Sequence, residues 1–171
     1  MRAAIYARCA VSVQGQPNPS LVKQIDRCRR SADLRGWTVV NDYVRSDSGA
    51  SGATLASTDQ LNSLIAAARK SPSPFDCIVI DKISRLGRDF IDVLRINDIL
   101  KRRGVFLWFV KEKLDSRDRG FHLGVVMNGM MNDLYTEAHA DKVRRGQKRR
   151  ALERIVQDRG SLRRSVDETK A

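Results

Sequence analysis

Long apolar runs are absent from this sequence. No stretch approaches the roughly 20 apolar residues that a membrane-spanning helix needs. The opening residues, Met1 to Ile5, also lack the extended apolar core of a secretion signal. We therefore expect a cytoplasmic protein that does not have a membrane as its partner.

Cysteine and histidine are scarce. The three cysteines, Cys9, Cys28 and Cys77, are odd in number and far apart, which favours reduced thiols over a disulfide scaffold or a zinc ribbon. The two histidines, His122 and His139, stand alone, and no His, Asp and Glu residues group at metal-ligand spacing. These absences argue against a two-metal nuclease, and we expect no metal.

The glycine-rich phosphate loops of nucleotide enzymes are missing too. Neither GxxxxGK[ST] nor GxGxxG occurs, so an ATPase or a dinucleotide enzyme is poorly supported and we expect no cofactor. What the chain does have is positive charge, with a formal total of +12. From Lys142 onward there are eleven Lys or Arg residues and four Asp or Glu residues. A basic segment of this kind is typical of contact with nucleic-acid phosphates.

Apolar runs alternate with helical patterns along the first 120 residues. Strands are predicted at 2–7, 37–44, 75–81 and 105–110, and helices at 20–35, 58–70 and 89–103. Ser20 is the expected N-cap of the first helix, and Gly36 and Gly104 are expected to end the first and third helices. The alternation predicts an α/β fold, namely a three-layer domain with a mainly parallel central sheet.

A long projecting C-terminal helix is predicted from about Phe121 to Arg159. It would be ~58 Å long, which is more than the width of such a domain. Its first half carries an apolar stripe at helical spacing, which includes Leu123, Met127, Met130, Met131 and Leu134. The stripe either packs on the chain's own sheet or forms a dimer interface, and periodicity alone does not decide between them.

The second half of this helix is basic. Its candidate DNA-binding residues are Lys142, Arg144, Arg145, Lys148, Arg149 and Arg150. The expected organisation is a catalytic domain at 1–120, a helix for dimerisation and DNA contact at 121–160, and a flexible basic tail at 161–171.

Phosphate-binding side chains follow the ends of the predicted strands. Arg8 follows the first strand, and the Ser/Gly-rich loop 46–52 follows the second. The third strand is followed by Lys82, Ser84, Arg85 and Arg88. In a parallel sheet, ligands bind beyond the carboxyl ends of the strands. These residues are either solvated loop charges or a site where arginines hold a phosphodiester without a metal.

Five segments together carry a family resemblance. They are YAR, SLVKQIDRCR, SGASGATL, DKISRLGRD and KVRRG, in this order over roughly residues 2–150. The sequence resembles the serine site-specific recombinases, the resolvase/invertase family. The resemblance implies a dimer, or a tetramer on DNA, that acts on double-stranded DNA. It also implies that a serine attacks a phosphodiester, forms a phosphoserine link, and is released when a strand is rejoined.

Five residues match the active-site pattern of that family. They are Arg8, Gln24, Ser51, Arg85 and Arg88. Lys82 keeps the basic character before the third-strand motif, and Ser84 stands where many members have Asp. The resemblance therefore implies that these side chains surround the scissile phosphate.

Two positions depart from the pattern. Ala10 occupies the position of the nucleophilic serine, and Thr58 lies where another phosphate-binding arginine is expected. A methyl group cannot attack phosphorus, so we expect the chain as written to be inactive. Ser12 is an alternative nucleophile if the loop shifts by two residues, whereas Ser48 and Ser51 are better placed to bind phosphate oxygens.

The segment after the long helix is a further departure. Only about twenty residues follow Arg150, without the DNA-binding module that family members usually carry there. Site specificity would then come from the basic helix, from a partner recombinase or specificity factor, or from a missing part. Three interpretations remain: a recombinase catalytic domain with its nucleophile replaced, a silent relative that regulates recombination, and an unrelated α/β enzyme for a small phosphorylated substrate.

Overall fold

The computed structural model describes residues 1–9, 18–48, 59–87, 89–131 and 147. The chain divides into two compact units, 1–129 and 130–171. All of the strands and helices described below begin in the first unit. No helix in these described ranges is long and apolar enough to cross a membrane.

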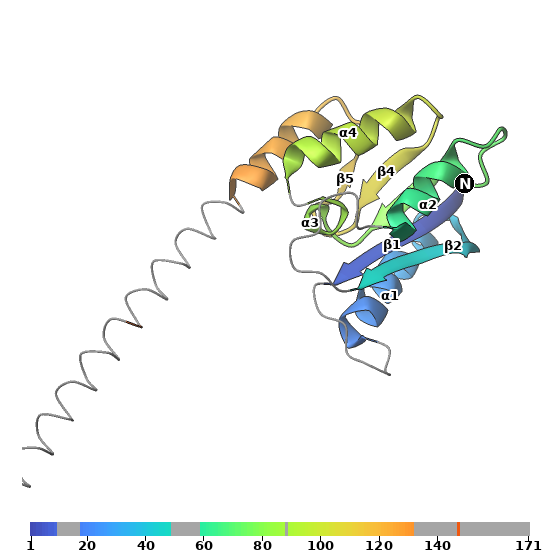
Figure 1. Cartoon of the computed structure of the whole chain (residues 1–171), viewed down its shortest axis with the longest axis horizontal. Coiled ribbons are helices and arrows are strands. Elements are labelled where there is room, and N and C mark those ends of the chain that lie inside the picture. The colour runs from blue at the N-terminus through green and yellow to red at the C-terminus, as the bar shows by residue number, and fades with distance from the viewer. Residues whose placement is uncertain (10–17, 49–58, 88, 132–146, 148–171) are drawn as a thin grey trace, which may run out of the picture. The chain divides into compact units, whose positions relative to one another are not determined.

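The centre of the first unit is a five-stranded sheet in the order β2-β1-β3-β4-β5 (Figure 1). The strands are β1 Arg2–Cys9, β2 Thr38–Ser48, β3 Cys77–Ile80, β4 Phe106–Phe109 and β5 Leu114–Asp115. All neighbouring strands are parallel except β4 and β5. The predicted mainly parallel sheet is therefore confirmed. The antiparallel β5 was not predicted, because a strand of two residues leaves no periodic pattern.

Helices lie on both faces of this sheet (Figure 1). They are α1 Pro19–Asp33, α2 Asp59–Ala68, α3 Ile83–Leu86, α4 Phe90–Lys101 and an unlabelled helix that is described over 121–131. Alternate residues of a strand point to opposite faces. Thus Cys77 and Val79 of β3 pack in one apolar cluster with α1, whereas Ile78 and Ile80 pack in another with α2 and α4. The predicted three-layer α/β architecture is confirmed.

The ends of the helices show where local sequence signals hold. The predicted N-cap at Ser20 is wrong: Asn18 caps α1, and its side-chain oxygen accepts a hydrogen bond from Ser20 N at 2.9 Å. Gly36 and Gly104 have φ values of 67° and 70°, the left-handed conformation that ends helices. Leu34 is 89% exposed because it follows the last helical residue.

The helix at 121–131 packs on the domain through one side only. Phe121 and Val125 are buried in the apolar cluster that α2 and α4 share. Gly124 lies so close to Leu114 that an added Cβ would fall 2.9 Å from its Cδ1. Leu123 and Met127 remain 64% and 57% exposed.

The three cysteines of the chain all lie in the first unit. All three cysteines are free and buried, as expected for reduced thiols, and burial raises the pKa of Cys28 and Cys77 to about 12.

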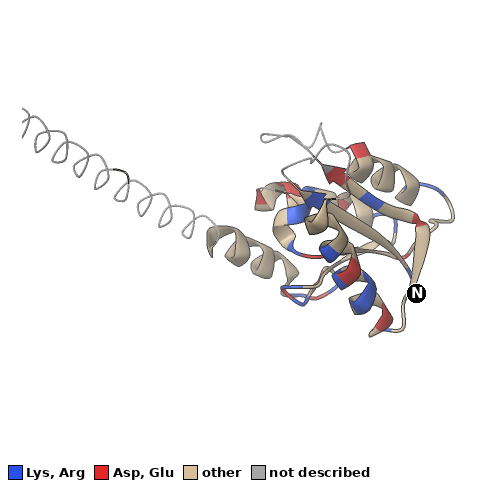
Figure 2. Ribbon diagram, turned by 90° about the horizontal axis from the view of Figure 1, so that it is seen from below, with Lys and Arg blue, Asp and Glu red and all other residues tan. Residues whose placement is uncertain are grey.

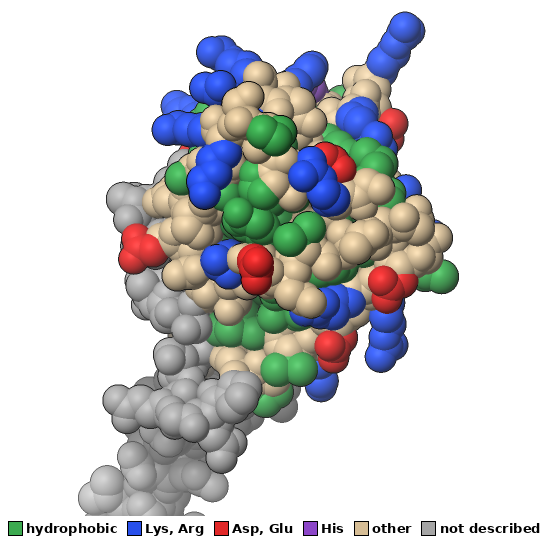
Figure 3. All heavy atoms as spheres, turned by 90° about the vertical axis from the view of Figure 1, so that its right-hand side faces the viewer, with side chains coloured by type: hydrophobic (Ala, Val, Ile, Leu, Met, Phe, Trp, Pro, Cys, Tyr) green, Lys and Arg blue, Asp and Glu red, His purple; other side chains and the backbone are tan. Residues whose placement is uncertain are grey.

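Acidic and basic residues are interspersed along the ribbon of the first unit (Figure 2). The face in Figure 3 likewise shows Lys and Arg among Asp and Glu.

Candidate phosphate-binding site

The carboxyl ends of β1 and β3 bring Arg8 and Arg85 into one region. Arg8 is the penultimate residue of β1, and Arg85 lies on α3, which begins three residues after the end of β3. The guanidinium Nη2 of Arg8 donates a hydrogen bond to the carbonyl oxygen of Ser84 at 3.1 Å. Because β1 and β3 are parallel neighbours, strand pairing delivers both arginines to the same edge of the sheet.

Gln24 fixes the end of β1. Its amide oxygen accepts from Arg8 N at 3.4 Å, and its amide nitrogen donates to Arg8 O at 3.2 Å and to Ser20 Oγ at 3.2 Å. The side chain is 1% exposed. Its polar atoms are thus engaged by the main chain of Arg8, which makes Gln24 a positioning residue for the arginine.

The short helix α3 presents Arg85, and neighbouring segments hold it in place. The carboxyl Oε1 of Glu112, from the β4–β5 connection, accepts from Ile83 N at 3.3 Å. Gly87 follows α3, and a Cβ there would lie 3.1 Å from Val93 Cγ2 on α4. Glycine therefore allows α3 and α4 to approach closely. The sequence did not predict α3, since four residues are too few to show a helical period.

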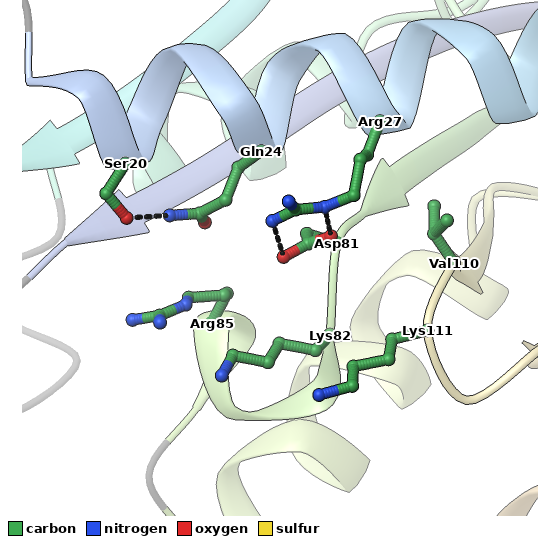
Figure 4. A pocket seen from close by; sticks show the side chains of 8 residues that line it. All are labelled: Ser20, Gln24, Arg27, Asp81, Lys82, Arg85, Val110 and Lys111. Carbon is green, nitrogen blue, oxygen red and sulfur yellow. Dashed lines mark hydrogen bonds and ion pairs between the residues drawn. The ribbon is translucent and has the colours of Figure 1, made fainter.

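A pocket of about 360 Å³ opens beside Arg85, between α1 and α3 (Figure 4). Its lining residues are Ser20, Gln24, Arg27, Asp81, Lys82, Arg85, Val110 and Lys111. Asp81 is 4% exposed, and both of its oxygens accept from Arg27, at 2.6 Å from Nε and 2.8 Å from Nη2. The only carboxylate among these lining residues is therefore already paired.

The remaining cations of the pocket affect one another. Burial lowers the pKa of the Lys82 ammonium from its usual range, and the nearby charges of Arg85 and Lys111 lower it further. Arg85 Nε is buried and has no hydrogen-bond partner in the described part of the chain. Asp81 and Glu112 oppose these effects, but the pKa of Lys82 remains lowered, so the pocket wall keeps a net positive character.

A buried tyrosine and a carboxylate connect β1 to β2 and α2. The Tyr6 hydroxyl donates to Asp47 Oδ2 at 2.9 Å, and burial, followed by the charge of Asp47, raises the pKa of Tyr6 above its usual range. Asp47 also accepts from Gln60 N at 3.2 Å and Leu61 N at 3.3 Å. Sequence analysis missed this contact. An acidic residue next to the end of β2, ahead of α2, was the available signal.

The other candidate residues fall outside the described part of the chain. These are Ala10, Ser12, Ser51, Thr58, Arg88, Leu134, Lys142, Arg144, Arg145, Lys148, Arg149 and Arg150. The structure therefore brings together Arg8, Gln24, Lys82 and Arg85, and the positions of the nucleophile and of the basic helix remain predictions.

Comparisons with known proteins give one family. The family described as "Resolvase, N terminal domain" matches residues 3–154. The N-terminal catalytic domain of TP901-1 integrase is 25% identical with a TM-score of 0.60, over 81% of this chain and 98% of that domain. A resolvase family site-specific recombinase from Streptococcus pneumoniae shares the fold, with 23% identity and a TM-score of 0.59 over 88% of this chain and 98% of that one. No curated protein matches.

Proposed function

Since the chain belongs to the resolvase family of serine recombinases, we propose that it is a catalytic domain for site-specific DNA cleavage and rejoining. In this proposal, Ala10 replaces the nucleophilic serine. Its fold is that of the recombinase catalytic domains described above. The chain as written then binds DNA phosphates but does not cut.

The observation that carries this proposal is the meeting of Arg8 with the helix that bears Arg85. Gln24 fixes the main chain of Arg8, and a hydrogen bond links the Arg8 guanidinium to Ser84 O. Guanidinium groups bind two phosphate oxygens at once and neutralise charge that develops at phosphorus. We assign the scissile phosphate to Arg8 and Arg85, with Arg88 and Ser51 as further ligands.

The reaction itself needs a nucleophile that this chain lacks at position 10. In the proposed chemistry, a serine oxygen forms a bond to phosphorus as a DNA phosphodiester bond breaks, and the freed strand end later displaces the serine. The methyl group of Ala10 has no lone pair for the first step. Ser12 is the alternative nucleophile, but in-line attack tolerates displacements of only ~0.5 Å.

A second candidate function is that of a silent regulator. Thr58 also departs from the family pattern, at the position expected for a phosphate-binding arginine. Loss of two catalytic groups with retention of Arg8 and Arg85 favours a protein that binds DNA, or a partner recombinase, without cutting. The departures at Ala10 and Thr58 are the specific observation behind this alternative.

The C-terminal segment supplies the remaining proposals. The exposed residues Leu123 and Met127, together with Met130, Met131 and Leu134, would pair two copies of the chain. The basic residues from Lys142 to Arg150 would then contact the DNA backbone. Such a dimer would act on double-stranded DNA in the cytoplasm, with a tetramer as the assembly for strand exchange.

Covalent trapping on a supercoiled plasmid that carries the DNA flanking the gene tests the proposal. The proteins to compare are the chain as written, Ala10→Ser, Ser12→Ala, and Ala10→Ser combined with Arg85→Gln as the control for phosphate binding. We expect a phosphoserine adduct only with Ala10→Ser, reduced at least about a hundredfold by Arg85→Gln, as for loss of one charge-stabilising donor.

The other outcomes choose among the alternatives. An adduct with the unmodified chain that Ser12→Ala abolishes would place the nucleophile at Ser12. DNA binding without any adduct would favour the regulator. Absence of DNA binding at low salt in every protein would contradict both functions.

A further inference from the structure

The pocket between α1 and α3 carries more positive charge than its one carboxylate balances, and Arg85 is the only one of its cations that the proposed catalytic centre uses. Four cationic side chains line it against one carboxylate, Asp81. Arg27 donates a hydrogen bond to each oxygen of that carboxylate, so the ion pair adds little net charge to the pocket. Within the described residues no ion pair is formed by Lys82, Lys111 or Arg85. Three positive charges thus line one small, open volume, and Asp81 and Glu112 oppose them only in part.

The two lysines reach this volume from different segments. Lys82 follows β3, whereas Lys111 follows β4, and Lys111 N donates to Asp81 O at 2.9 Å, which fixes the two segments side by side. Figure 4 shows both ammonium groups extending toward the same side of the pocket, below the Arg27–Asp81 pair. Mutual repulsion between Lys82, Lys111 and Arg85 would be relieved by an anion between them.

The pocket has the size and the charge to hold a phosphate group. Its volume of about 360 Å³ is at the lower end for small-molecule sites, too small for a duplex but ample for one phosphate with part of its sugar. Ammonium groups bind phosphate as point charges, and the guanidinium of Arg85 adds planar, directed donors. A carboxylate ligand would use the same charges but is absent from DNA.

We propose that this pocket is a second phosphate-binding subsite, in which Lys82 and Lys111 hold a phosphate group beside the one assigned to Arg8 and Arg85. The subsite rests on the proposed function only in taking the DNA backbone as one source of that phosphate. A free phosphate is the other source. Arg85, which borders both positions, would couple their occupancy.

Protection of lysines from chemical acetylation tests the subsite directly. The full chain would be treated with acetic anhydride alone, with a mixed-sequence DNA duplex, and with inorganic phosphate, and each lysine would be quantified by mass spectrometry. We expect a bound phosphate to lower modification of Lys82 and Lys111 several-fold while leaving Lys113 unchanged. Lys113 is the internal control because it is exposed, lies in the same connection and does not line the pocket.

Salt-dependent DNA binding supplies an independent measurement. Lys82→Gln combined with Lys111→Gln should reduce the slope of log affinity against log salt by about 0.9, the value for one lost phosphate contact. Lys101→Gln combined with Lys113→Gln removes the same charge from exposed positions outside the pocket and should leave the slope unchanged.

Each outcome has one meaning. Protection by DNA with the reduced slope assigns the subsite to a backbone phosphate, and protection by inorganic phosphate alone assigns it to a free phosphate. If neither ligand protects the two lysines while the unmodified chain still binds DNA, the subsite is wrong and the proposed function stands. If the chain binds no DNA, the proposed function fails, and the inorganic phosphate arm alone decides the pocket.

Discussion

Glu112 is a half-buried acid whose two carboxyl oxygens have different surroundings. Oε1 accepts from Ile83 N at the start of α3, whereas Oε2 is buried and has no hydrogen-bond partner in the described part of the chain. Burial raises the pKa of Glu112, and the hydrogen bonds and the charge of Lys111 only partly oppose this. Glu112 therefore positions the helix that carries Arg85. Burial destabilises the charged form of its own carboxyl group.

Replacement of Glu112 by Gln should change how stability depends on pH. A carboxyl whose pKa is higher in the folded state binds more protons when folded, so its contribution to stability falls as pH rises from about 4.5 through the raised value. Glu112→Gln removes this fall. We expect the variant to be more stable than the unmodified chain at neutral pH and the difference to shrink as pH drops toward 4.5.

Urea unfolding across this pH range measures the difference. Asp98→Asn is the matched control, since Asp98 is exposed and loses the same charge. A difference that stays constant with pH would show that Glu112 acts by packing alone.

At the scale of secondary-structure elements, the start of α2 depends on a residue from β2. The two oxygens of Asp47 accept from Gln60 N and Leu61 N, and one also accepts from the buried Tyr6 hydroxyl. The first N–H groups of a helix have no partner within the helix. Asp47 satisfies two of them from another element and thereby attaches α2 to the sheet.

Removal of this carboxylate should destabilise the domain markedly. Asp47→Ala should lower the free energy of unfolding by about 2–4 kcal/mol, from a lost cap and an unsatisfied buried hydroxyl. Asp42→Ala, at an exposed position on the same strand, should stay within about 0.5 kcal/mol of the unmodified chain.

A double-mutant cycle with Tyr6→Phe isolates the hydroxyl. The combined variant should lose less than the sum of the two single variants, because Asp47→Ala then leaves no hydroxyl unpaired. Additive effects in denaturant unfolding would mean that the bond between Tyr6 and Asp47 contributes nothing.

Sequence patterns predicted the long elements and missed the short ones. Four strands and three helices extend over enough residues to show a period, whereas α3 and β5, with four and two residues, do not. Arg8 and Gln24 were named as site residues from motifs. That Gln24 bonds to the main chain of Arg8 depends on how α1 packs on β1, which is a tertiary contact that no local pattern encodes.

For the protein as a whole, the exposed apolar side of the helix at 121–131 is relevant to self-association of the chain. Phe121 and Val125 already bury the opposite side against the domain. Leu123 and Met127 are left exposed, as are the side chains of Met130 and Met131. Contiguous exposed apolar residues on a helix commonly mark an interaction surface. Self-association through this stripe is the proposal to test.

A charge placed in the stripe should weaken such an association. In a two-fold dimer each substitution occurs twice, so Met127→Glu should raise the dimer Kd at least about tenfold, or ~1.4 kcal/mol. His122→Glu adds the same charge at another exposed position of the helix and should have little effect. Sedimentation over a range of concentrations gives both values. A purely monomeric unmodified chain at high micromolar concentration would contradict the dimer.

The strand order has a consequence for how the chain folds during synthesis. β1 lies between β2 and β3, yet its partner residues in β3 are more than seventy positions later: Ala3 pairs with Cys77 and Tyr6 with Ile80. Pairings between such distant segments form slowly. Until the ribosome has synthesised Ile80, β1 can pair only with β2. Its other edge then remains open to pairing with other chains. Arg8 and Arg85 meet only after that edge has closed, so the candidate site is completed late in folding.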